Sequence, residues 1–157
     1  MDHVLPDDLR DIVRHLESSY PREGCGLILR AKGAGDWRIR PMTNAYDRYH
    51  AQDPARFPRT SKTAYLFDPK EWLAVQEETD QRREEVSCVY HSHIDAGAYF
   101  SAEDRVMAAP DGEPLLPGVT YLVVAVDAGQ ASAAKLFWWE AGEFRETSIA
   151  LPSQRIG

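Results

Sequence analysis

Two histidines one residue apart, followed by a serine and an aspartate, constrain this chain more than any other feature. They are His91 and His93, with Ser101 and Asp104 downstream. Residues 85–90 have the β-branched and aromatic content that is typical of a strand. Because residues i and i+2 of a strand face the same side, both imidazoles can reach one ion. Ser101 has the features of a helix N-cap with Asp104 in the first turn, which directs a carboxylate back towards the end of the strand.

Two imidazoles and one carboxylate are a ligand set that suits zinc, and a purely structural zinc site usually adds a fourth side chain, most often cysteine. Neither cysteine fits that role. Cys88 is expected to point to the other face of the strand, and Cys25 has no CxxC partner. The sequence therefore predicts a zinc site formed by His91, His93 and Asp104 with an open fourth position. Zinc lowers the pKa of a water bound there to about 7, which indicates hydrolysis.

The spacing His-x-His-x7-Ser-x2-Asp over residues 91–104 resembles the metal motif of the JAMM (MPN+) metallopeptidases. These enzymes also have a catalytic glutamate far upstream, and the resemblance assigns that role to Glu23, which stands in a Glu-x-Cys-Gly sequence before an apolar segment. The segments Asn-Ala-Tyr at 44–46 and Phe-Asp-Pro-Lys-Glu at 67–71 resemble the bacterial branch that acts on small ubiquitin-like sulfur-carrier proteins. The resemblance spans about residues 1 to 150.

The resemblance implies a mechanism and a substrate class. Glu23 would take a proton from water and pass it to the leaving amine, and Ser101 would donate to the developing oxyanion while it also caps the helix. The implied reaction is hydrolysis of an amide or isopeptide bond at the C-terminal tail of a ubiquitin-like or sulfur-carrier protein. Many eukaryotic deubiquitinating members have proline directly after the second histidine, where this chain has Ile94. That difference weakens any transfer of ubiquitin specificity.

Periodicity and turn residues predict one α/β domain over residues 1–157, with a mixed, largely antiparallel sheet flanked by helices. The resemblance implies that this is the MPN fold, related to the cytidine-deaminase architecture. The segment 44–63 shows no periodicity and is expected to be a long loop. Other expected elements are helices at 5–20, from Pro69 towards Arg83 with Asp68 as N-cap, and from 101, and strands at 24–29, 37–40, 65–67, 85–90, 119–126, 135–139 and 144–149.

Composition limits the possible partners. The chain of 157 residues has a net charge of −7 and a pI near 5.2, and no cluster of lysines and arginines resembles a nucleic-acid footprint. Two cysteines suit a reducing compartment. No apolar run is long enough to span a membrane and no apolar leader is evident at the start, so a cytoplasmic location is expected. The oligomeric state stays open.

Three other functions are compatible with parts of the pattern. A catalytically silent MPN scaffold in a protein complex would lack ligands or the glutamate, and all are present here. Amidohydrolase barrels also place His-x-His after a strand, but they need about 250 residues. Nucleotide deaminases use His-x-Glu with a CxxC pair, which this chain lacks.

Overall fold

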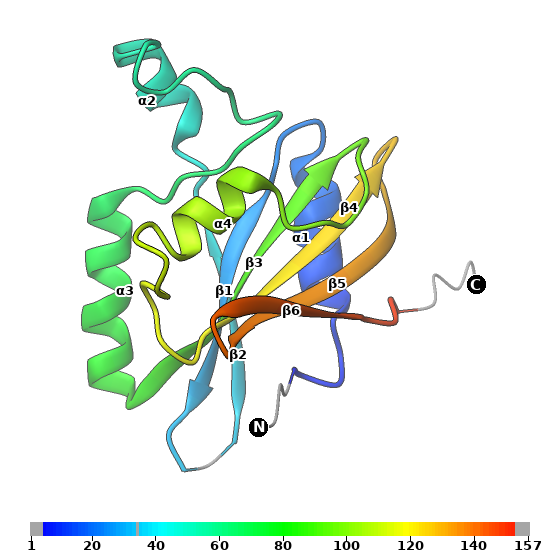
Figure 1. Ribbon diagram of the computed structural model, residues 1–157. Helices are drawn as coiled ribbons and strands as arrows, with labels where there is room; N and C mark the ends of the chain where they lie inside the picture. Colours follow the sequence, from blue (N-terminus) through cyan, green and yellow to red (C-terminus); the bar gives the residue numbers. More distant parts are fainter. Residues whose placement is uncertain (1–4, 34, 153–157) are drawn as a thin grey trace.

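Six strands form one mixed sheet in the computed structural model, which describes residues 5–33 and 35–152 (Figure 1). Their order is β2-β1-β3-β4-β5-β6, and β3 pairs with β4 in parallel while the four other pairings are antiparallel. The bounds are β1 Cys25–Ala31, β2 Trp37–Met42, β3 Glu84–Ile94, β4 Thr120–Asp127, β5 Gln130–Glu140 and β6 Glu143–Ser148. The predicted α/β class with a mixed, largely antiparallel sheet is confirmed.

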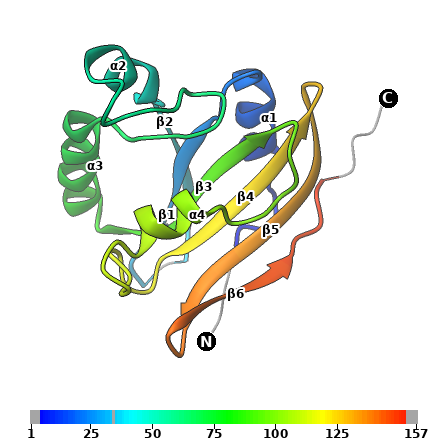
Figure 2. The same ribbon diagram turned by 45° about the horizontal axis from the view of Figure 1, so that its top comes forward.

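Helices cover both faces of the sheet. In Figures 1 and 2, α1 (Arg10–Ser19) lies on one face, while α3 (Pro69–Arg82) and α4 (Ala102–Ala108) lie on the other. The core is divided accordingly. One cluster packs Leu9, Ile12 and Leu16 of the α1 side against the sheet, and the other packs Val75 and Ala108 of α3 and α4 against the opposite side. From Cys88 onwards, alternate residues of β3 therefore face α1 and the α3–α4 layer, whereas before it a register shift in the pairing with β1 interrupts this alternation.

Helix α1 is shorter than the sequence predicts. It begins at Arg10 rather than near Leu5, because the Asp8 carboxylate accepts a hydrogen bond from the Arg10 backbone N–H at 2.9 Å, directly before the first turn. Leu5 remains outside the helix but still packs against the α1-side core. The apolar periodicity thus reports burial correctly, although it extends past the helix itself.

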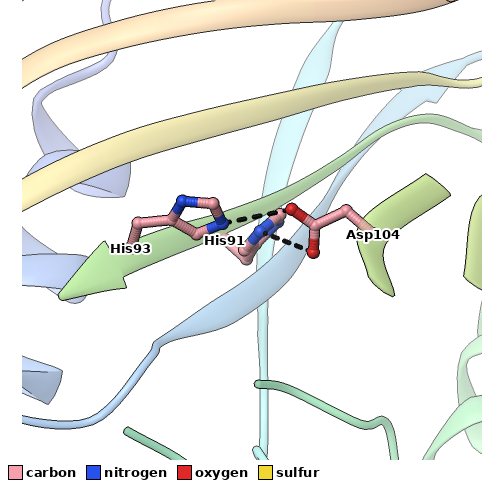
Figure 3. Close-up of side chains that lie close together, drawn as sticks. All are labelled: His91, His93 and Asp104. Carbon is pink, nitrogen blue, oxygen red and sulfur yellow. Dashed lines mark hydrogen bonds and ion pairs between the residues drawn. The ribbon is translucent and has the colours of Figure 1, made fainter. Parts of the chain in front are cut away.

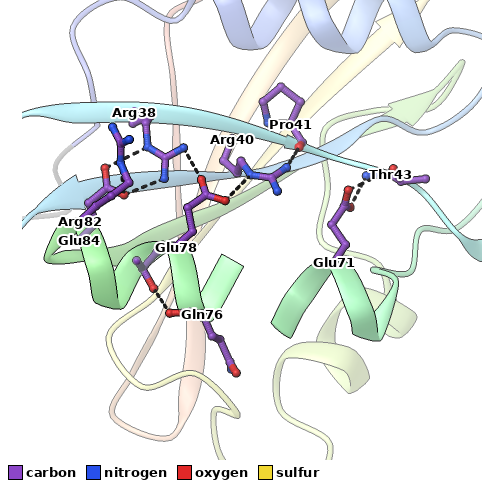
Figure 4. A network of polar contacts seen from close by, with 10 residues as sticks. Arg38, Arg40, Pro41, Thr43, Glu71, Gln76, Glu78, Arg82 and Glu84 are labelled. Atoms are coloured by element: carbon purple, nitrogen blue, oxygen red, sulfur yellow. Dashed lines mark hydrogen bonds and ion pairs between the residues drawn. The ribbon is translucent and has the colours of Figure 1, made fainter. Parts of the chain in front are cut away.

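Helix α3 begins where the sequence predicts. Asp68 is the N-cap, and its side chain accepts a hydrogen bond from Lys70 N at 2.9 Å. A network of ion pairs joins the helix and the start of β3 to β2 (Figure 4): Arg38 contacts Glu84 at 2.7 Å and Glu78 at 2.6 Å. The hydrogen bond to Glu84 raises the pKa of the Arg38 guanidinium, so this contact keeps its charge at any physiological pH.

The segment 44–63 differs from the predicted loop, because it contains α2 (Tyr46–Gln52). The N-cap residue of α2, Ala45, has no side chain that can cap, and Tyr46 is the one buried residue of the helix, so α2 lacks the N-cap type and the apolar periodicity by which helices are predicted. Tyr46 and Tyr49 pack on the ring of Phe57 instead. The strand expected at 65–67 is also absent: among the described residues this segment makes one isolated bridge, between Asn44 and Phe67.

Two further sequence predictions concern the environment of the chain. In the described part, no helix is both long enough and apolar enough to cross a bilayer. The expected lack of an apolar leader depends partly on residues 1–4, which lie outside the described residues. Both cysteines are free thiols and fully buried, Cys25 facing the α3–α4 layer and Cys88 facing α1.

Candidate metal centre

Strand β3 places two imidazoles on the face covered by α3 and α4. His91 and His93 lie two residues apart in a regular parallel ladder with β4, opposite Val123 and Ala125. Their ring centroids are 5.1 Å apart, and both side chains are buried, with 0% and 5% of the residue surface exposed. The expected same-side placement of the two rings is therefore present.

Helix α4 supplies the carboxylate through its first turn. Ser101 is the N-cap, and its Oγ accepts a hydrogen bond from Asp104 N at 3.0 Å, while Asp104 Oδ2 accepts one from Ser101 N at 3.0 Å. This reciprocal capping box fixes both residues at the start of the helix. Because the cap holds the carboxylate, Asp104 has little freedom to turn away from the strand.

The three predicted ligands converge (Figure 3). Asp104 Oδ2 lies 3.1 Å from His93 Nε2, and Asp104 Oδ1 lies 3.3 Å from His91 Nε2. One ligand atom from each residue can be chosen so that all lie within 4.8 Å of one another. Zinc bonds of about 2.0–2.1 Å in a tetrahedron place ligand atoms about 3.3 Å apart. Each of the two measured separations is close to that length, one from each oxygen of the carboxylate.

The hydrogen bonding of His93 favours a cation between the side chains. Its Nδ1 lies 3.2 Å from Gly97 O, and because a carbonyl can only accept, Nδ1 carries the proton and donates. In a neutral ring Nε2 then presents a lone pair towards the Asp104 carboxylate. Two acceptors at 3.1 Å need a positive charge between them, which is either a metal ion or a proton on Nε2 that makes the ring an imidazolium. Donation of the second ring nitrogen to a carbonyl is also the usual arrangement of a metal-bound histidine.

His91 provides a second sign of a cation. Its Nδ1 and Nε2 have no hydrogen-bond partner among the described residues, although both are buried. The 3.3 Å approach of Nε2 to Asp104 is an ion-pair distance without hydrogen-bond geometry. Burial lowers the pKa of His91 against the opposing effect of Asp104, which favours the neutral ring that binds metals. Unpaired buried nitrogens are rare in folded proteins.

The carboxylate itself is held ionised. Burial acts to raise the pKa of Asp104, but His91, His93 and the Ser101 N–H together hold that pKa well below its usual range. Within the described ranges, no other His, Cys, Asp or Glu joins the three-residue group. Cys25 stands opposite His91 in the β1–β3 ladder, but its Sγ is directed to Met42 O at 3.8 Å. The donor set fits zinc with a fourth position not taken by these side chains.

Glu23 lies on the same side of the sheet as the histidines. Gly24 and Ser92 continue the β1–β3 pairing one residue beyond Cys25 and His91, through bonds from Gly24 N to Ser92 Oγ (2.9 Å) and from Ser92 N to Gly24 O (3.0 Å). Alternation then places Glu23 on the face of His91. Its residue surface is 5% exposed.

The electrostatics of Glu23 also connect it with the site. Burial, followed by the carboxylates of Asp104 and Glu103, raises the pKa of Glu23 to about 9, against a smaller lowering by Arg59. A buried carboxyl with a raised pKa holds a proton more tightly than a free one, and a perturbed pKa of this kind is typical of residues that transfer protons. Through the two bonds to Gly24 described above, Ser92 takes a structural role on the opposite face.

Three neighbours of the site were not evident from the sequence. The ring of Tyr65 stacks on His91 at a centroid distance of 4.4 Å, and the half-exposed Tyr99 meets His93 edge-on at 4.7 Å. Arg59, beyond α2, forms an ion pair with Glu103 of α4, so the 43–67 segment reaches the helix that carries Asp104. The contacts of Tyr65 and Arg59 join segments that are distant in the sequence. Tyr99 is the one of the three that lies close in sequence to a predicted site residue, because it stands two residues before Ser101.

Comparisons with known proteins agree with this geometry. The family described as prokaryotic homologs of the JAB domain matches residues 6–140. A protein named desampylase, from Haloferax volcanii, is 32% identical over 152 residues, which cover 94% of each chain. A solution structure of a protein from Salinibacter ruber is similar with a TM-score of 0.58 and 29% identity, covering 96% of this chain and 91% of that one.

A second solution structure, of a protein from Desulfitobacterium hafniense, has a TM-score of 0.64 at 22% identity and covers 93% of this chain and 89% of that one, a likeness of fold. The family match includes Glu23 and the whole segment 91–104. The resemblance drawn from the metal motif is confirmed: the chain belongs to the prokaryotic JAB (JAMM/MPN) family and is a hydrolase of the JAMM isopeptidase type.

Proposed function

We propose that this protein is a zinc-dependent isopeptidase that hydrolyses the bond following the C-terminal tail of a ubiquitin-like protein. The observation that carries this proposal is the convergence of His91, His93 and Asp104, with two buried imidazole nitrogens facing one carboxylate. In this proposal residues 1–157 act as one catalytic domain, supported by the family match over residues 6–140.

His91, His93 and Asp104 would hold the ion through Nε2, Nε2 and the carboxylate. A bound zinc polarises a carbonyl oxygen and lowers the pKa of a water in its open position to about 7. The protein fixes the ligands from both sides: the β3 ladder orients the imidazoles, Gly97 O accepts from His93 Nδ1, and the capping box restrains Asp104. The ion therefore needs little rearrangement of the chain to bind.

Glu23 would transfer the proton, and Ser101 would stabilise the negative charge of the developing oxyanion. The carboxylate of Glu23 accepts a proton from the attacking water and then donates it to the leaving amine, which leaves the enzyme unchanged after one turnover. Ser101 Oγ accepts from Asp104 N, so its own hydroxyl hydrogen stays available to donate to the developing oxyanion. Ser101 is half-buried, at the rim of the buried ligand group.

The substrate class follows from the relative and from the sequence matches. The Haloferax volcanii protein bears the name desampylase, which denotes removal of a ubiquitin-like modifier. The motifs at 44–46 and 67–71 resemble the branch acting on small sulfur-carrier proteins, so the finer proposal is a sulfur carrier whose C-terminal amide is cleaved. The basic side chains beyond α2, including Arg56 and Lys62, suit an acidic face on that carrier.

The test is incubation of the purified, zinc-loaded protein with candidate sulfur-carrier and ubiquitin-like conjugates, followed by intact-mass measurement. The expected product is a carrier shortened at the amide bond, with water added. Glu23→Gln should keep one zinc per chain by elemental analysis and lose about 10²–10⁴ in kcat.

Two results would contradict the proposal. Zinc binding without cleavage of any conjugate would identify a catalytically silent scaffold. Full activity of Glu23→Gln would remove Glu23 from the mechanism and leave the proton transfer to another group.

A further inference from the structure

The backbone of Glu23 is held by a part of the chain that belongs to neither β1 nor β3. Its N–H donates to Ser61 O at 2.6 Å, and its carbonyl accepts from Asn44 Nδ2 at 2.9 Å. Both partners lie in the segment 43–67, which surrounds α2. The regular β1–β3 ladder begins only at Cys25, so these two bonds restrain the residue that precedes it.

The side-chain amide of Asn44 uses all of its hydrogen-bonding capacity. Besides the bond to Glu23, Nδ2 donates to Ala64 O at 3.0 Å, and Oδ1 accepts from Tyr46 N at 3.1 Å and from Leu66 N at 3.2 Å. Two donors meet carbonyls and one oxygen meets two N–H groups, so the orientation of the amide is determined by its partners. Asn44 thus joins the end of β2, the start of α2 and the 64–66 segment to Glu23.

The second contact, Ser61, is fixed in turn by α2. Its N–H and its Oγ donate to the two oxygens of Asp47, at 2.7 and 2.6 Å, and Ser61 itself is 2% exposed. The hydrogen bonds from Ser61 lower the pKa of Asp47, which keeps this acceptor ionised. The carbonyl that receives the Glu23 N–H is therefore anchored to a helix rather than to a free loop.

We propose that Asn44 is a positioning residue for Glu23: by holding the Glu23 carbonyl, it sets the direction in which the carboxyl leaves the backbone. The inference rests on the proposed function, because Glu23 must reach the attacking water. A general base acts only within hydrogen-bond reach of the proton that it takes, and a displacement of about 1 Å can lower the rate about 10²-fold. Residues 43–67 thus become part of the catalytic apparatus without contacting the substrate.

The test uses Asn44→Asp, which keeps the shape and the acceptor oxygen but replaces the donor with an acceptor facing Glu23 O and Ala64 O. The expected result is a fall in kcat of about 10- to 100-fold with KM within about twofold and one zinc per chain. In a Glu23→Gln background the same substitution should cause no further loss, because a residue that acts through Glu23 has nothing left to position. A purely structural residue would lower activity in both backgrounds.

The matched control is Glu71→Ala. Glu71 of α3 accepts from Thr43 N at 2.7 Å and from Thr43 Oγ1 at 3.3 Å, next to Asn44 in sequence (Figure 4). Its removal loosens the same segment from α3 but leaves the bonds to Glu23 in place. We expect a lower Tm and an unchanged kcat for this variant.

A second measurement is independent of turnover. Hydrogen exchange of the Glu23 amide in the metal-free protein reports the bond to Ser61 O, and Asn44→Asp should lower its protection about 10-fold, while Glu71→Ala should not. If Asn44→Asp fails to fold, Asn44→Ala removes the donor without adding a charge and answers the same question.

The two proposals fail in different ways. If the wild type cleaves no conjugate, the proposed function is wrong, and exchange at Glu23 still decides whether Asn44 restrains it. If the wild type is active and Glu23→Gln keeps only residual activity, the positioning role is overturned by an unchanged kcat in both Asn44 variants. It is equally overturned if Asn44→Asp causes the same loss in the Glu23→Gln background as in the wild type.

Discussion

The two faces of β3 differ in how their polar atoms are satisfied. On the α1 side, Tyr90 Oη lies 2.7 Å from His15 Nδ1, and Ser92 Oγ accepts from Gly24 N. On the other side, His91 has two buried nitrogens without hydrogen bonds, and His93 directs a ring nitrogen at a carboxylate. Neighbouring residues of one strand thus serve opposite purposes: one face stabilises the fold, and the other keeps binding capacity for an ion.

Packing on the α1 side is correspondingly tight. A Cβ on Gly26 would lie 2.3 Å from the Oη and Cζ atoms of Tyr90, which stands opposite it in the ladder. The glycine thus allows the tyrosine ring to lie directly over the neighbouring strand. This close approach is the physical reason for glycine after the cysteine in the Glu-x-Cys-Gly sequence. Glu23, at the start of the same sequence, belongs to the other face of the sheet.

The largest effect should follow from removing an imidazole on the metal side. His93→Ala leaves two ligands, and because each ligand is needed for tight binding, we expect loss of bound zinc and at least a 10³-fold loss of kcat/KM. Elemental analysis and conjugate cleavage measure both. One zinc per chain in this variant would show that the ion binds elsewhere.

Removal of the metal should make stability depend on pH through Glu23. Its pKa of about 9 in the folded chain is above the ordinary value of 4.5, so the stabilisation is complete below pH 4.5 and is lost as pH rises through 9. The free energy of unfolding of metal-free Glu23→Gln should therefore equal that of the wild type near pH 5 and exceed it near pH 9. The expected difference is on the order of 3 kcal/mol, taken from 1.36 kcal/mol per pH unit and reduced for relaxation of the folded chain. Thermal unfolding in a chelator at the two pH values measures this. A pH-independent difference would contradict the raised pKa.

Ser101 tests whether the helix cap and the chemistry can be separated. Ser101→Ala removes the acceptor for Asp104 N, which should cost about 1 kcal/mol of stability, and also removes the oxyanion donor, which should lower kcat about 10²-fold. Ser101→Thr keeps both functions and is the matched control. If alanine lowers Tm but not kcat, Ser101 is a cap alone.

The smallest effect is expected on the α1 side. Tyr90→Phe removes the bond to His15 and should cost about 1 kcal/mol, a fall of about 2–4 °C in Tm, because the ring packing remains. Zinc content and kcat should not change, as calorimetry and the cleavage assay would establish. A loss of zinc in this variant would mean that the two faces are coupled.

Local patterns in the sequence predict the elements that hold the ligands, because each rests on short-range physics. Alternation places His91 and His93 together, and the cap at Ser101 fixes Asp104. The sequence does not show the ring of Tyr65 on His91 or the bond from Asn44 to Glu23, since these pair residues 26 and 21 positions apart without a repeating pattern. The sequence shows little sign of helix α2 for a similar reason, because the helix is supported by contacts with Phe57 rather than by its own periodicity.

The two cysteines have a practical consequence for experiments on this protein. Both are fully buried, and burial raises the pKa of the Cys25 thiol far above its usual range and that of Cys88 to about 12. Thiolates are the reactive form, so neither native sulfur should compete for maleimide reagents in the folded chain. A cysteine introduced at Leu115, whose surface is 64% exposed, would accept a fluorophore or spin label selectively, without replacing either native residue.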